Sequence, residues 1–194
     1  MKTSIALVAL AAISTLTPSV LSPARAAEHV DKAHGEGWAT IKKAVAVIHP
    51  TQGNQCHGAV EFTQDGDKIK VVAHIEGLTA GQKHAIHVHQ FGDCSASDGM
   101  SAGGHYNPEG HEHGLPEKGK RHAGDLGNLT ADSAGKAHYE ITVDNITIAG
   151  VKNPIIGRAV IVHAKVDDGG QPVGNAGARI GCGVIGIANT GEKK

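Results

Sequence analysis

Short runs of alternating apolar residues, separated by turn residues, constrain the fold of this chain more than any other feature. The runs have the period of two that is typical of strands with one buried face. No segment has a convincing amphipathic helical period, and Gln-Asp-Gly-Asp at 64–67 is a hairpin turn signal. The pattern predicts seven or eight strands in an antiparallel sandwich or barrel. The predicted strands lie within 43–48, 59–62, 68–75, 84–90, 136–143, 158–166 and 179–188.

The composition further restricts the number of domains, the kind of core and the class of partner. The chain has 194 residues, which suits one domain, and aromatic residues make up only 3% of it. The core must therefore be built from Val, Ile, Ala and Leu. The 27 glycines favour many turns over long helices. The formal net charge of −1 argues against a nucleic-acid partner, because such proteins carry a basic patch or stripe.

The first 26 residues have the pattern of a secretory signal peptide. Lys2 precedes an apolar run at 5–16, and Ala24-Arg25-Ala26 fits a cleavage site. The alternative, a buried helix of the mature domain, is kept open, whereas the run is too short for a membrane span. We expect residues 27–38 to form a flexible extension and residues 39–190 to form the domain. Export predicts a periplasmic or secreted protein.

Two polar, glycine-rich segments interrupt the strand pattern, at 91–134 and at 167–178. Long loops inside a compact domain are usually functional. The longer segment carries His105, His113, His122 and Asp125 at intervals of 8, 9 and 3 residues. Three imidazoles and one carboxylate make a plausible tetrahedral zinc site, although a solvated polar loop is the alternative.

A second group of histidines lies on predicted strands. His87 and His89 are two residues apart, so both imidazoles project from one face of a strand. His163 lies on another predicted strand and would complete a second site if the strands are neighbours. An all-imidazole site suits copper or zinc. Taken alone, each of these histidines could equally be a structural residue.

Four segments carry several distinctive residues each: Ala85–Asp93 (AIHVHQFGD), Gly104–Pro108 (GHYNP), Arg121–Asn128 (RHAGDLGN) and Gly174–Gly186 (GNAGARIGCGVIG). Together they resemble copper/zinc superoxide dismutases, and the resemblance runs from about residue 43 to residue 188. It implies an all-β, eight-stranded Greek-key β-barrel, which is an immunoglobulin-like sandwich, with a long metal-binding loop and a shorter second active-site loop.

The resemblance also implies a role for each site residue. His105 would be shared by both metals, Asp167 would connect a copper histidine to a zinc histidine, and Arg179 would hold the superoxide anion. His105 and Arg179 are thus the expected catalytic residues. The implied copper ligands are His87, His89, His105 and His163, and the implied zinc ligands are His105, His113, His122 and Asp125.

Further expectations follow from the same resemblance. The activity is the dismutation of superoxide to oxygen and hydrogen peroxide, with copper alternating between two oxidation states and zinc fixing the geometry. Cys94 and Cys182 match a disulfide, which leaves Cys56 as a buried free thiol or an intermolecular bridge. The segment 183–188 resembles a dimer-forming edge and predicts a homodimer. Independently of the resemblance, His29 and His34 in the extension could, with the amino terminus, recruit copper weakly.

Two other functions remain open at this point. The chain could be a metal-binding module without turnover, such as a copper carrier or zinc buffer. It could instead be a purely structural zinc domain. A copper carrier of this fold would have a Cys-rich acceptor domain, which the sequence lacks, and all implied copper ligands and Arg179 are present. A structural zinc domain would not explain His87, His89, His163 and Arg179.

Overall fold

The computed structural model describes residues 37–38 and 40–191. The predicted signal peptide, His29, His34 and nearly all of the predicted extension lie outside these residues. The described part contains eight strands and one 3-10 helix, η1 (Met100–Ala102). The strands are β1 (Lys43–Pro50), β2 (His57–Asp65), β3 (Lys68–Glu76), β4 (Lys83–His89), β5 (Asp125–Thr130), β6 (Ala137–Val143), β7 (Ala159–His163) and β8 (Arg179–Ile187).

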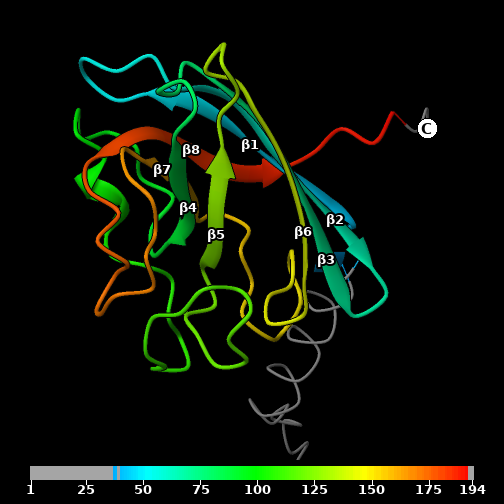
Figure 1. The fold of residues 1–194 in the computed structure, drawn as a ribbon. Helices are drawn as coiled ribbons and strands as arrows, with labels where there is room; N and C mark the ends of the chain where they lie inside the picture. Colours follow the sequence, from blue (N-terminus) through cyan, green and yellow to red (C-terminus); the bar gives the residue numbers. More distant parts are fainter. Residues whose placement is uncertain (1–36, 39, 192–194) are drawn as a thin grey trace, which may run out of the picture. The chain divides into compact units, whose positions relative to one another are not determined.

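The strands form a nearly closed antiparallel barrel with the order β5-β4-β7-β8-β1-β2-β3-β6 (Figure 1). β3 pairs with β6 and β4 pairs with β7, so the β3–β4 and β6–β7 connections each join strands that are not neighbours in the sheet. These connections are the Greek-key feature that the resemblance implied. Among the described residues, no helix is long and apolar enough to cross a membrane.

β5 and β6 are the two ends of the sheet order and are joined by a side chain. The Tyr139 hydroxyl of β6 donates a hydrogen bond of 2.7 Å to the carbonyl oxygen of Leu126 in β5. Burial raises the pKa of Tyr139 to about 12, which keeps the hydroxyl protonated as a donor. This hydrogen bond connects the two edges where strand pairing stops.

Seven of the eight strands lie in segments predicted from alternation, and β5 does not. β5 lies within 91–134, which the sequence pattern indicated as one long loop. Its sequence, DLGNLT, contains Asp, Gly and Asn, which are depleted in strands. Five of its six residues are buried or half-buried on successive positions, so it has no clear alternation of polar and apolar residues. Pairing with β4, rather than local preference, makes this segment a strand.

The core is built mainly from aliphatic residues, as the composition predicted. Alternate residues of β3, including Ile69 and Val71, point inward and are fully buried. Phe62 of β2 is the one large aromatic side chain among the fully buried ones. Cys56 is a buried free thiol, and burial raises its pKa to about 12.

A disulfide attaches the long loop to the barrel. Cys94 follows β4, and Cys182 lies on β8, with a Cα–Cα distance of 5.9 Å. Ala102, Ala159 and Ile161 are buried in a small apolar cluster around the bond. The first part of the long loop is thereby held next to β7 and β8. His89 is the last residue of β4, and His163 is the last residue of β7.

Candidate metal centre

β4 supplies two buried histidines in the middle of one half of the sheet. His87 and His89 are at most 1% exposed, and β4 lies between β5 and β7. In the register with β7, His87 lies opposite Ile161 and His89 opposite Ala159. His163 ends β7, two residues beyond Ile161. Strand pairing therefore brings His163 beside the two histidines of β4.

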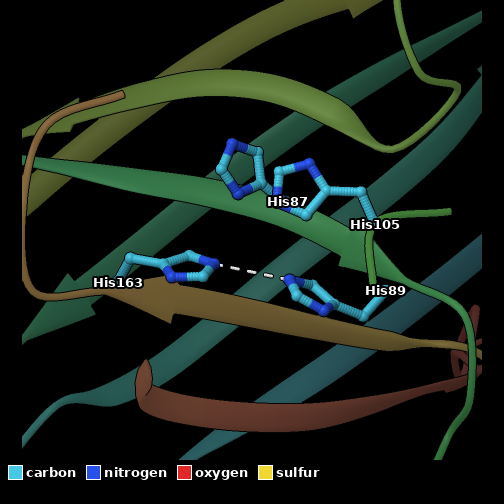
Figure 2. Close-up of side chains that lie close together, drawn as sticks. All are labelled: His87, His89, His105 and His163. Atoms are coloured by element: carbon cyan, nitrogen blue, oxygen red, sulfur yellow. Dashed lines mark hydrogen bonds between the residues drawn. The ribbon is translucent and has the colours of Figure 1, made fainter. Parts of the chain in front are cut away.

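The structure gathers the four predicted copper residues, His87, His89, His105 and His163, into one cluster. One nitrogen from each ring lies within 4.8 Å of the others. Figure 2 shows the four rings around a common space, with Nε2 of His89 3.4 Å from Nε2 of His163. His105 reaches the cluster from the long loop, through a β-bridge with His89.

The four predicted zinc residues form a second buried cluster around Asp125, the first residue of β5. Oδ1 of Asp125 lies 2.9 Å from Nδ1 of His105 and 3.2 Å from Nδ1 of His122. Oδ2 lies 3.0 Å from Nδ1 of His113. The backbone N–H groups of Gly114 and His122 also donate to Oδ2. His105 belongs to both clusters, so the structure places it between them as the resemblance implied.

The carboxylate of Asp167 connects one histidine of each cluster. Its Oδ2 lies 2.9 Å from Nε2 of His87, and its Oδ1 lies 2.9 Å from Nε2 of His113. Nδ1 of His87 is buried and has no hydrogen-bond partner, whereas Nδ1 of His113, also buried, lies 3.0 Å from Oδ2 of Asp125 without hydrogen-bond geometry. A buried nitrogen without a partner is costly, so Nδ1 of His87 fits ligation of a metal ion, and Nδ1 of His113 beside the Asp125 carboxylate fits an imidazole–carboxylate metal site.

Backbone carbonyls orient two further rings. Nδ1 of His89 donates to the carbonyl oxygen of Gly103 at 3.0 Å, and Nδ1 of His163 to that of Gly177 at 3.3 Å. Nε2 of each ring is then the nitrogen that faces the cluster. Metal-binding histidines usually donate their other N–H in this way, which fixes the tautomer. The residues present therefore fit two metal ions.

The electrostatics of the two clusters differ. Burial lowers the pKa of His105 to about 4 and holds that of His163 well below its usual value. These rings are therefore neutral near pH 7 and can ligate a cation. Burial alone would raise the pKa of Asp125, but its histidine contacts hold it well below the usual range. Asp125 is thus an anion, which suits a cation held beside it.

Arg179 lies beside the first cluster, at the start of β8. It pairs in register with His163 of β7. Its guanidinium donates to the carbonyl oxygen of Gly99 at 2.8 Å and to that of Gly103 at 2.6 Å. The side chain is half-buried. A guanidinium held in this way presents a fixed positive charge next to the histidines.

Three residues with a part in the centre were not identified from the sequence. Asn128 clamps the backbone of Asp167: its Nδ2 donates to the Asp167 carbonyl at 2.9 Å, and its Oδ1 accepts from the Asp167 N–H at 2.7 Å. Gly103 and Gly177 act through their carbonyl oxygens. Asn128 ends one of the segments that carry the resemblance, which is a weak signal. A backbone acceptor leaves no signal in the side-chain sequence.

Comparison with known proteins adds two findings. Residues 56–185, more than half of the chain, match the family described as copper/zinc superoxide dismutase (SODC). The chain is also similar to the crystal structure of the clock protein EA4, with 39% sequence identity and a TM-score of 0.70. That similarity covers 77% of this chain and 96% of the other.

Proposed function

Because the chain belongs to the copper/zinc superoxide dismutase family, we propose that it is an exported enzyme that converts superoxide to oxygen and hydrogen peroxide. The observation that carries the proposal is the pair of buried clusters that share His105. One cluster is formed by imidazoles alone, and the other contains a carboxylate. Arg179, an anion-binding group, lies at the imidazole cluster.

The donor sets support one assignment of the metals. Copper would be held by His87, His89, His105 and His163, because a site of imidazoles alone suits this ion. Zinc would be held by the cluster that contains Asp125. When bound, copper supplies one-electron oxidation and reduction, and zinc supplies a fixed positive charge. The zinc ligands would be His105, His113, His122 and Asp125.

His105 is the residue that can hold and release a proton. Its Nδ1 faces Asp125, so Nε2 is the nitrogen directed to the imidazole cluster. Two superoxide ions and two protons give one O2 and one H2O2, so the cycle consumes two protons. We assign one of them to Nε2 of His105 and the other to water.

Arg179 is proposed to bind and orient superoxide. Two of its N–H groups are occupied by the carbonyls of Gly99 and Gly103, which fix the plane of the guanidinium. A guanidinium has five N–H donors, so three remain for an anion. The positive charge would also raise the association rate of superoxide, an effect for which this enzyme family is a standard example.

The proposal also includes the cellular compartment and the oligomeric state. The Cys94–Cys182 disulfide is consistent with an oxidising compartment, and with residues 1–26 as a signal peptide it supports a periplasmic or secreted protein. We also propose a homodimer formed through β8 and its neighbour β1. Exposed apolar side chains at Val47, Val184 and Ile187 support this surface as the contact.

The test is metal content and dismutation rate of the chain after loading with copper and zinc. We expect one copper and one zinc per chain and turnover near the diffusion limit, roughly 10⁸–10⁹ M⁻¹s⁻¹. His163→Ala should lose copper and activity but retain zinc, because His163 belongs only to the first cluster. His49→Ala, at an exposed histidine of β1, is the matched control and should change neither. Tight zinc with weak copper and negligible turnover would instead indicate a zinc buffer.

A further inference from the structure

Three histidines outside the metal centre lie on the outer face of the barrel. His57 is on β2, His74 on β3 and His138 on β6, and all three are exposed. They line one open hollow, together with the carboxylates of Glu76 and Asp132. The proposed dismutation uses none of these side chains.

Strand register places two of these histidines face to face. His74 pairs directly with His138 across the β3–β6 ladder, and the ring centroids are 4.5 Å apart. Their Nδ1 atoms are separated by 3.3 Å. Directly opposite residues on one face of an antiparallel pair have Cβ atoms roughly 4.5–5.5 Å apart, so the sheet itself fixes this approach.

The spacing of the two nitrogens is that of a chelating pair. Two nitrogens that are bound at 2.0–2.1 Å to a tetrahedral Zn²⁺ lie roughly 3.3–3.4 Å apart. The same separation occurs inside the metal centre, between Nδ1 of His105 and Nδ1 of His122 at 3.3 Å. It occurs there again between Nε2 of His89 and Nε2 of His163, at 3.4 Å. The outer pair therefore has the same nitrogen–nitrogen separation as these pairs in the buried clusters.

We propose that His74 and His138 form a third metal site, which binds a divalent transition cation such as Zn²⁺ through their Nδ1 atoms. Oε1 of Glu140 lies 3.3 Å from Nε2 of His138, so the carboxylate can fix the tautomer that leaves Nδ1 free. Water completes the coordination, because both rings face solvent.

His57 is placed to add a third imidazole. It pairs with Glu76 on β3, two residues from His74 and on the same face. Its Nδ1 donates to the carbonyl oxygen of Gln55 at 2.7 Å, which leaves Nε2 as the free nitrogen. Glu76 itself is paired with Lys136 at 2.9 Å. His57 would therefore strengthen the site without being essential to it.

The site would have a structural consequence for the barrel. β6 is the last strand of the sheet order and forms a ladder only with β3. An ion bound by His74 and His138 would cross-link this edge strand to its neighbour. Binding to the folded chain alone would then raise its thermal stability with the logarithm of the Zn²⁺ concentration once that concentration exceeds the dissociation constant.

The test is a calorimetric titration of the copper- and zinc-loaded chain with Zn²⁺. We expect one additional equivalent in the wild type and a rise in melting temperature with Zn²⁺. Both should be lost in His74→Gln and in His138→Gln, with the dismutation rate unchanged. His49→Gln, at an exposed histidine of β1, should keep the additional equivalent. His57→Gln should weaken it.

Two results would overturn the third site. The first is a wild type that binds no Zn²⁺ beyond the buried centre. The second is an additional equivalent that persists in the double variant His74→Gln, His138→Gln, which would place it elsewhere on the chain. The comparison of wild type with the double variant is independent of turnover. A failure of the third site is therefore distinguishable from a failure of the proposed dismutation.

Discussion

His89 and Arg179 donate to the same acceptor, the carbonyl oxygen of Gly103. The distances are 3.0 Å from Nδ1 of His89 and 2.6 Å from the guanidinium. One backbone group thus orients a proposed copper ligand and the proposed superoxide-binding residue. The segment that carries it follows Cys94, whose disulfide attaches the long loop to β8. The position of this loop therefore sets the spacing between ligand and anion site.

Arg179 gives the most direct test of anion binding. Arg179→Ala should lower the dismutation rate constant by at least about tenfold, because electrostatic steering contributes roughly 10- to 1000-fold to such rates. Arg179→Lys should recover part of the rate, since it keeps the charge but not the fork of donors. The measurement is the rate as a function of ionic strength, at matched copper content. Equal rates in all three proteins would refute the assignment.

Asp167 is expected to position both metal sites without contacting either metal. Asp167→Asn should weaken zinc binding by roughly 10- to 100-fold, which is typical for the loss of a partner of a metal-binding histidine. Competition with a chelator measures the zinc affinity. Asp168→Asn is the matched control, because Asp168 is exposed and its carboxylate accepts hydrogen bonds only within its own loop, from Gly170 and Asn175. Equal affinities in both variants would contradict the positioning role.

The disulfide should make a large contribution to stability. Cys94 and Cys182 are 88 residues apart. The chain-entropy relation gives an upper value of roughly 4–5 kcal/mol for a loop of this length. Cys94→Ser combined with Cys182→Ser should lower the free energy of unfolding by up to that amount, as measured by urea denaturation. A wild type that is equally stable with and without reductant would show that the bond contributes little.

Cys56 should be unreactive in the folded chain. The thiolate is the reactive form, and burial raises the pKa of Cys56 to about 12. Iodoacetamide should therefore leave Cys56 unmodified at about pH 8.5, the pKa of a free thiol, and should modify it after denaturation. Mass spectrometry of the two samples is the measurement. Rapid modification of the native chain would show that the thiol is accessible.

The same shift predicts a dependence of stability on alkaline pH. In the unfolded chain the thiol ionises near its ordinary pKa, whereas in the folded chain it stays protonated up to about pH 12. The contribution is therefore fully present below about pH 8.5 and is lost as the pH rises towards 12. Cys56→Ala should show a smaller decline over that range. An identical pH profile would contradict the burial of an uncharged thiol.

Local pattern predicted most of the barrel because most strands have one buried face. β3 is the clearest case: Ile69 and Val71 point inward while Lys68 and Lys70 point to solvent. β5 was not predicted, because its residues are buried without alternation and its partner is distant in the sequence. Strand pairing with β4 carries no local signal.

The residues of the metal centre also fall into two groups, those that the sequence indicated and those that only the structure identified. The His-x-His spacing at His87 and His89 and the spacing of the loop histidines indicated metal ligands. His163 had no metal signal of its own until the strands were paired. The carbonyls of Gly103 and Gly177 and the amide of Asn128 were visible only in three dimensions.

The sequence by itself determined the kinds of donor available and the strand period, because residue chemistry and the two-residue repeat are local properties. Only the tertiary structure decided which donors meet. The β4–β7 register brings His163 diagonally next to His87, and the β3–β6 register brings His74 opposite His138. The physical reason is that contacts between distant strands depend on the packing of the whole barrel, whereas side-chain alternation depends only on the nearest residues.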